Sequence, residues 1–168
     1  TSFRRARFLN FLDPWQDATD VGYQLIHSLY AIGSGGFFGV GLGQSKQKAL
    51  YIPEPYNDFI FSIIVEETGF LGGMLIIALF IVLIAAGINV AIKAKDMYGR
   101  LLSTGIISVV AIQLIINVAV VTGSMPVTGI PMPFISYGGT SMVFIMAAMG
   151  ILLNISKVSK SLEKNELA

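Results

Sequence analysis

The sequence contains no cysteine and a single histidine among its 168 residues. The lack of cysteine excludes disulfide bonds and thiolate metal sites, and it leaves the cellular compartment open. Charged residues make up only 12% of the chain and the net charge is +1, so no global field attracts nucleic acid and we expect no such partner. Apolar residues make up 54%, a share that soluble domains of this size rarely reach. The composition therefore predicts a membrane protein.

Two long, strongly apolar stretches without a charged residue predict the membrane-crossing helices. Residues 68–92 form the first, which at about 1.5 Å per residue exceeds the roughly 30 Å of bilayer hydrocarbon. Residues 101–156 are too long for one crossing and are interrupted by prolines and glycines. We divide them into helices over 101–122 and 134–156, joined by a loop at 123–133. The predicted fold class is all-α integral membrane, with three transmembrane helices.

Basic residues near the spans predict the orientation. The loop at 93–100 and the tail at 157–168 fall on one side of a three-span chain, and each carries three Lys or Arg residues. Because positive loops stay in the cytoplasm, we assign this side, with the C-terminus, to the cytoplasm. Residues 1–67 and the 123–133 loop are then extracytoplasmic, although three arginines near the N-terminus argue mildly the other way.

The N-terminus suggests that the chain is a fragment. It has no initiator methionine, and its basic residues are not followed by an apolar run of signal-peptide length. A polar segment before the first span would need its own route across the membrane. We therefore expect further spans before Thr1.

The segment 1–67 contains features of an interfacial helix and a glycine-rich turn. Asp20 is a suitable N-cap, and the predicted apolar stripe consists of Val21, Leu25, Leu29 and Ile32, with Gln24, His27 and Ser28 elsewhere on the helix surface. His27 has no partner at ligand spacing, so we interpret it as an interfacial polar residue and not as a metal ligand. The glycines of residues 33–43 match no nucleotide-binding spacing. We expect them to let the backbone turn or approach another surface closely.

Acidic residues lie directly beside an apolar helix in the stretch 51–69. If Asn57 is the N-cap, Asp58 takes the first helical position and Glu66 lies about 80° around the helix, on the same face. Glu67 would point nearly opposite. Two interpretations stay open: these acids mark a helix start and the membrane boundary, or they are functional groups whose costly desolvation is used.

Gln113 and Asn117 are polar residues spaced i, i+4 within the second predicted span. The spacing puts both on one helix face. Hydrogen bonding between helices is the simpler interpretation, and a transport pathway is the alternative.

Four motifs, in order along the chain, resemble one protein family. They are FLDPW at 11–15, YQLIHSLYAIGSGGFFGVGLGQSKQK at 23–48, IPEPYNDFIFSIIVEETGFLGG at 52–73, and PVTGIPMPFISYGGTS at 126–141. Together they are similar to the SEDS family of cell-wall polymerases, which contains FtsW, RodA and SpoVE, and they look closer to its division and sporulation members. The resemblance implies the C-terminal part of a roughly ten-span fold in a bacterial plasma membrane, with short interfacial helices in a large extracytoplasmic loop.

The resemblance also implies an activity. Members polymerise lipid II into glycan strands with inversion, beside a class B penicillin-binding protein and other division or sporulation membrane proteins. The family's essential aspartate maps onto Asp58, in a motif where Asn57 replaces the usual threonine. Asp58 would accept the proton of the GlcNAc 4-hydroxyl as this group attacks the anomeric carbon of MurNAc and expels undecaprenyl diphosphate. A helix N-terminus lowers the pKa of such a carboxyl and an apolar interface raises it, so this role requires desolvation to prevail.

The resemblance extends to the remaining site residues. The leaving diphosphate needs positive charge, from Arg4, Arg7 and Lys48 or from a divalent cation such as Mg²⁺ or Mn²⁺. The other expected substrate-binding residues are Gln44, Glu54, Glu66, Pro126, Thr128, Gly129, Ser136, Tyr137, Gly138 and Gly139. The Pro126–Gly129 loop and the turn at 136–141 have two interpretations. In the first, the prolines end one helix and small residues allow the next helix to start in close packing. In the second, the segments line the lipid II cavity or contact the partner's membrane helix. Rival functions are a flippase of lipid-linked precursor and a non-catalytic scaffold.

Overall fold

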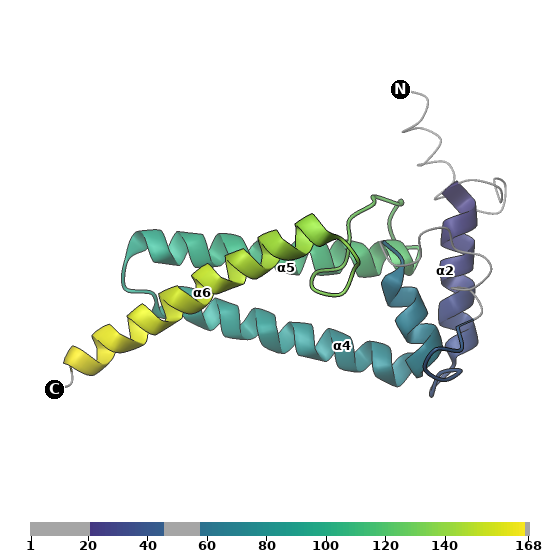
Figure 1. The fold of residues 1–168 in the computed structure, drawn as a ribbon, viewed down its shortest axis with the longest axis horizontal. Helices are drawn as coiled ribbons and strands as arrows, with labels where there is room; N and C mark the ends of the chain where they lie inside the picture. The colour runs from purple at the N-terminus through teal and green to yellow at the C-terminus, as the bar shows by residue number, and fades with distance from the viewer. Residues whose placement is uncertain (1–20, 46–57, 167–168) are drawn as a thin grey trace, which may run out of the picture. The chain divides into compact units, whose positions relative to one another are not determined.

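The computed structural model describes residues 21–45 and 58–166, and every regular element in these ranges is a helix. The helices are α2 (Val21–Gly35), α4 (Ile60–Lys93), α5 (Met97–Val121) and α6 (Gly139–Glu166) (Figure 1). Three segments are long and apolar enough to cross a membrane: Ile60–Lys93, Met97–Val121 and Gly139–Ser159. The expected all-α chain with three membrane-spanning helices is confirmed.

The helices α4 and α6 begin at positions that differ from the expected spans. Helix α4 consists of two helical segments that meet at the non-helical residue Gly69. The expected span over 68–92 corresponds to the segment after this kink, and the segment before it, which begins at Ile60, contains the acidic pair. Helix α6 begins at Gly139 and not at 134, because a turn occupies residues 133–135 and Phe134 has a positive φ of 63°. That backbone conformation cannot continue into a right-handed helix.

The chain divides into two compact units. The first unit contains α2, α4 as far as Ile76, α5 from Gln113, and the loop that continues to Tyr137. The second unit contains α4 from Ile77, α5 as far as Ile112, and α6. The acidic residues of the predicted site that the structure describes all belong to the first unit.

In the first unit α4 changes direction at Gly69, where φ is 74° and ψ is −176° (Figure 1). The break removes helical partners from the surrounding backbone groups, and the glycine-rich loop after α2 replaces them. The carbonyls of residues 66–67 accept the N–H groups of residues 40–41 at 3.0 and 3.1 Å. The N–H groups of residues 70–71 donate to the carbonyls of residues 36–37 at 2.9 and 3.4 Å. The kink is thus satisfied by main chain, as a buried backbone requires.

Glycine is required where these two backbones meet. A Cβ at Gly39 would overlap the carbonyl of Glu67, and a Cβ at Gly69 would overlap the carbonyl of Phe37. Both glycines also have φ in the left-handed region, which glycine adopts without steric cost. The expectation that the glycines of residues 33–43 allow a turn and a close approach is confirmed.

Helix α5 ends in a Schellman motif centred on Gly123, whose φ is 69°. The N–H of Gly123 donates to Val120 at 3.0 Å, and the N–H of Ser124 donates to Ala119 at 2.7 Å. The carbonyl of Val121 accepts the hydroxyl of Ser28 on α2. The chain therefore leaves the helix with these terminal backbone groups satisfied.

The buried face of α2 is set by this contact. Ser28 is fully buried and donates its hydroxyl to the carbonyl of Val121 at 3.0 Å. Leu25 and Ala31 are buried with it, whereas Leu29 is 37% exposed. The expected stripe is therefore wrong at Leu29, and Ser28 belongs to the buried face, because the end of α5 needs a hydrogen-bond donor there.

The second unit is built from helices and one tight connection. Residues 94–96 join α4 to α5, and the carboxylate of Asp96 caps α5 by accepting the N–H of Gly99 at 2.6 Å. Gly87 of α4 faces Ile107 of α5, where a Cβ would come within 2.5 Å of the isoleucine side chain. A small residue here lets the two helices pack closely.

Candidate functional site

Asp58 lies in a turn directly before α4 and not at the first helical position. In a helix its carbonyl would accept the N–H of Ser62. Ser62 donates instead to Phe59 at 3.1 Å, and the carbonyl of Asp58 accepts the side-chain amide of Asn117 at 2.9 Å. The helical geometry that placed Asp58 and Glu66 on one face does not apply, so that expectation is wrong.

Asn117 links the Asp58 turn to the loop that follows α5. Its Nδ2 atom also donates to the carbonyl of Ile130 at 2.9 Å, and the residue is 1% exposed. We expected hydrogen bonding between helices, but both partners are carbonyls of irregular segments. Gln113 makes no comparable link, because its buried side-chain oxygen has no hydrogen-bond partner within the described residues.

Gly129 lies beside the carboxylate of Asp58. A Cβ at Gly129 would come within 3.4 Å of the Oδ2 atom of Asp58, and the φ of Gly129 is 74°. Asp58 is half-buried, and Thr128 and Gly129 are exposed. The approach of Gly129 to Asp58 shows that the structure brings the 126–129 motif and Asp58 together from distant parts of the sequence. Pro126 of the same loop is half-buried.

Glu66 belongs to the interior of the first unit. Its side chain is 1% exposed, and its Oε2 atom accepts the hydroxyl of Ser45, which is itself buried. Glu67 is half-buried, and its Oε1 atom has no hydrogen-bond partner within ranges 21–45 and 58–166. Gln44 is exposed. The contact of Glu66 with Ser45 supports a structural role in holding the glycine-rich loop against α4.

The second half of the 126–141 motif splits between structural and exposed positions. Ser136 is 8% exposed, its hydroxyl accepts the N–H of Met132 at 2.7 Å, and its own N–H donates back to the Met132 carbonyl at 3.1 Å. This reciprocal pair favours a turn-forming role. Tyr137 is 83% exposed. Gly138 and Gly139 belong to the second unit, at the start of α6.

The expected diphosphate ligands Arg4, Arg7 and Lys48 lie outside the described residues, as do Glu54, Asn57 and Asp20. Within the described part of the first unit the sequence has three acids and no Lys or Arg. No group of three His, Asp or Glu side chains that could hold a metal ion occurs in the described ranges. The divalent cation therefore stays a prediction.

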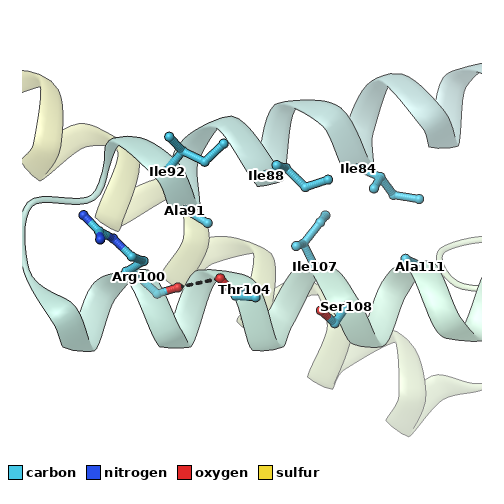
Figure 2. Close-up of a pocket in the computed structure, with 9 residues that line it drawn as sticks. All are labelled: Ile84, Ile88, Ala91, Ile92, Arg100, Thr104, Ile107, Ser108 and Ala111. Carbon is cyan, nitrogen blue, oxygen red and sulfur yellow. Dashed lines mark hydrogen bonds between the residues drawn. The ribbon is translucent and has the colours of Figure 1, made fainter.

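A pocket of about 400 Å³ lies in the second unit, between α4 and α5 (Figure 2). Its lining consists of Ile84, Ile88, Ala91, Ile92, Arg100, Thr104, Ile107, Ser108 and Ala111. The guanidinium of Arg100 donates to the carbonyl of Ala94 at 3.2 Å. The hydroxyl of Thr104 donates to the carbonyl of Arg100 at 2.8 Å (Figure 2). The lining contains no carboxylate or imidazole. The pocket therefore lacks a general base, and Asp58 remains the candidate catalytic residue.

Sequence reasoning identified Asp58 but missed the residues that hold its surroundings. Asn117 was noted as polar within an apolar span, a position that predicts a partner without identifying it. Ser28 and Ser45 gave no signal of their own, because serine is common on interfacial helices and in loops. Only the folded chain connects Ser28 to the C-terminal end of α5 and Ser45 to Glu66.

Comparisons with known proteins agree with these motifs. The family model for FtsW, RodA and SpoVE, described as cell cycle protein, matches residues 1–161. Stage V sporulation protein E of Bacillus subtilis (strain 168) is 54% identical, over 94% of this chain and 43% of that protein. A probable peptidoglycan glycosyltransferase FtsW of Geobacter sp. (strain M18) is 48% identical, over 92% of this chain and 42% of that protein. The chain thus spans about two fifths of these relatives.

Two solved structures show the same fold. One comes from work titled "Structural coordination of polymerization and crosslinking by a peptidoglycan synthase complex", with a TM-score of 0.77 and 28% identity over 95% of this chain and 43% of the other. The other is the rod shape determining protein RodA of Thermus thermophilus, an aspartate-to-alanine mutant, with a TM-score of 0.60 and 32% identity over 77% of this chain and 39% of the other. With its three apolar helices and its match along residues 1–161, the chain belongs to the FtsW/RodA/SpoVE family of membrane proteins.

Proposed function

We propose that the family-length protein, meaning a chain of the relatives' full length that contains this sequence, is a peptidoglycan glycosyltransferase that polymerises lipid II. The observation that carries the proposal is the half-buried carboxylate of Asp58, held in a turn outside the helix and beside the Gly129 backbone. The relatives named as probable peptidoglycan glycosyltransferase support the same reaction. Asp58 is the general base in this proposal.

The chemistry assigns one step to Asp58. The 4-hydroxyl of a GlcNAc on one lipid-linked chain attacks the anomeric carbon of MurNAc on another. A new carbon–oxygen bond forms, the bond to the diphosphate breaks with inversion, and the hydroxyl proton passes to the Asp58 carboxylate. The half-buried setting limits competing water, and the open Cα of Gly129 leaves room beside the Oδ2 atom for an approaching hydroxyl.

The departing diphosphate requires positive charge. In the proposal the basic residues Arg4, Arg7 and Lys48 supply it from the part of the chain that the structure does not describe. A divalent cation is the other source that we expected, and no step above depends on it. The described part of the first unit contains three acids and no Lys or Arg, and these acids repel an anionic leaving group, so the need for positive charge from elsewhere is greater.

The proposal includes a setting and partners. Residues 1–67 face the extracytoplasmic side of the bacterial plasma membrane, where lipid II carries its sugars, and the C-terminus faces the cytoplasm. The protein acts beside a class B penicillin-binding protein and other division or sporulation membrane proteins. Support comes from the similar structure of a peptidoglycan synthase complex and from the division and sporulation names of the relatives.

Replacing Asp58 in the reconstituted family-length protein tests the function. Asp58→Asn keeps the shape and removes the base, so polymerisation of purified lipid II should fall by at least about 100-fold. Asp96→Asn is the matched control, because asparagine caps a helix as well as aspartate and Asp96 belongs to the second unit. It should retain full activity.

The same preparation separates the rival functions. Full polymer from Asp58→Asn would contradict the proposed base and favour a scaffold. Transfer of a labelled lipid headgroup across the bilayer without polymer formation would favour a flippase. The flippase has lost its main support, because Asn117 donates its amide hydrogens to two backbone carbonyls.

A further inference from the structure

We propose that Asn117 is a positioning residue, which sets the Asp58 carboxylate and the 126–130 loop at a fixed distance from each other. The inference rests on the proposed function for its effect on catalysis, and on the structure alone for the geometry. One amide nitrogen donates to the carbonyls of Asp58 and Ile130, each at 2.9 Å. These carbonyls belong to two segments separated by one entire helix hairpin in the sequence.

The chemistry of the site fits a primary amide. Both partners are carbonyls, which only accept hydrogen bonds, so one side chain that binds both must donate two hydrogens. The Nδ2 atom of asparagine does this, whereas leucine and ionised aspartate of nearly the same shape present none. The Oδ1 atom is buried without a hydrogen-bond partner in the described residues. The desolvation of that oxygen is costly, which argues that the two donated bonds are what the position requires.

The link acts on the wall that faces the base. Gly129 directly precedes Ile130, and its Cα lies beside the Oδ2 atom of Asp58. If the bond to Ile130 is lost, the loop loses one restraint and the space for the acceptor hydroxyl changes. A displacement of about 1 Å at a reacting centre can lower a rate by roughly 100-fold. Substrate binding draws on many other contacts of the lipid and its sugars, so KM should change much less than kcat.

The kinetic test uses the reconstituted family-length protein and purified lipid II. Asn117→Leu should lower kcat by about 10- to 100-fold and change KM by less than about threefold. Gln113→Met is the matched control, since Gln113 shares the helix face and its side-chain oxygen has no hydrogen-bond partner in the described chain. It should keep the parental kcat. An unchanged kcat in Asn117→Leu would overturn the proposal.

A geometric test works even if Asp58 is not the base. The chain lacks cysteine, so spin labels can be placed at the exposed residues Thr128 and Ser34 through cysteine substitutions. Both sites belong to the first unit. The distance distribution between the labels should be narrow with Asn117 and with Gln113→Met, and it should broaden in Asn117→Leu. A distribution that stays narrow overturns the positioning role, whatever Asp58→Asn does to activity.

A folding defect is distinguished with Asn117→Asp. This variant keeps the shape of asparagine and, when ionised, donates no hydrogen bond. Correctly folded Asn117→Asp with low kcat and a broad distance distribution supports the proposal. If both Asn117 variants fail to fold while Gln113→Met folds normally, Asn117 is a stability residue only, and the positioning role is overturned.

Discussion

Different interactions stabilise the interior of each of the two units. Buried polar residues of the described chain are Ser28, Ser45, Ser62, Glu66, Asn117 and Ser136 in the first unit and Ser103 in the second. In the first unit these side chains mostly bind backbone groups at turns and helix ends. In the second unit, helices pack through buried apolar side chains, and Gly87 lets α4 approach Ile107 of α5 closely.

The difference follows from the solvent. Backbone in a bilayer must find its hydrogen bonds within the protein, and a helix does this by itself. The first unit contains a kink, a glycine-rich loop and a long connection after α5, so it needs partners from elsewhere. Such irregular backbone also places a carboxylate outside a helix, next to a second loop. The proposed chemistry and the unusual hydrogen bonds therefore occur in the same unit.

The largest expected effect comes from closing the space at the α4 kink. Gly69→Ala places a methyl group against the Phe37 carbonyl and imposes a strained backbone angle. The structure cannot move either backbone without breaking the bonds between the glycine-rich loop and α4. We expect a loss of stability of at least about 3 kcal/mol, measured as unfolding in detergent micelles.

A substitution at Gly36 distinguishes the cost of backbone strain from the cost of steric overlap. Gly36 also has a positive φ, of 54°, but a Cβ there has nothing within 4 Å. Gly36→Ala should therefore cost only about 1 kcal/mol. Equal losses for Gly36→Ala and Gly69→Ala would show that the loop does not lie tightly against the kink.

The next largest effect is expected at Gly129, beside the proposed base Asp58. Gly129→Ala adds a methyl group 3.4 Å from the Oδ2 atom of Asp58, where we place the acceptor hydroxyl. Polymerisation of lipid II should fall by about tenfold, beyond the effect of backbone strain of roughly 1 kcal/mol. Gly43→Ala is the control, with a φ of 77° and nothing within 4 Å of the new Cβ. Equal activities in the two variants would argue against a hydroxyl site beside Gly129.

Charge gaps predicted most of the fold. The uncharged stretches identified three apolar helices, because bilayer thickness sets their length and charge is costly inside them. They did not predict the helical segment before the kink, since residues 60–65 are apolar and the acidic pair separates them from the uncharged stretch. They also could not predict the kink at Gly69, which depends on a loop about 30 residues earlier in the chain.

The site was predicted in part. Motifs identified Asp58 and the loop at 126–129, and the structure brings them together. Helix periodicity gave the wrong position for Asp58, because a side chain from α5 takes the carbonyl that a helix would use. It also gave no hint that Glu66 is enclosed with Ser45. Such pairings join distant parts of the sequence, and local patterns contain no information on them.

The smallest effect should come from the second unit and should leave the proposed chemistry unchanged. Asp96→Ala removes the carboxylate that accepts the N–H of Gly99 at the start of α5, which should cost about 1 kcal/mol of stability. Asp96→Asn should restore most of it, since asparagine also caps helices. Lipid II polymerisation at a temperature well below unfolding should be unaffected in both, because Asp96 belongs to the second unit and Asp58 and Gly129 belong to the first. A fall in activity that Asp96→Asn does not repair would show that the two units are coupled through the charge at residue 96, and the contrast between a structural and a catalytic region would have to be abandoned.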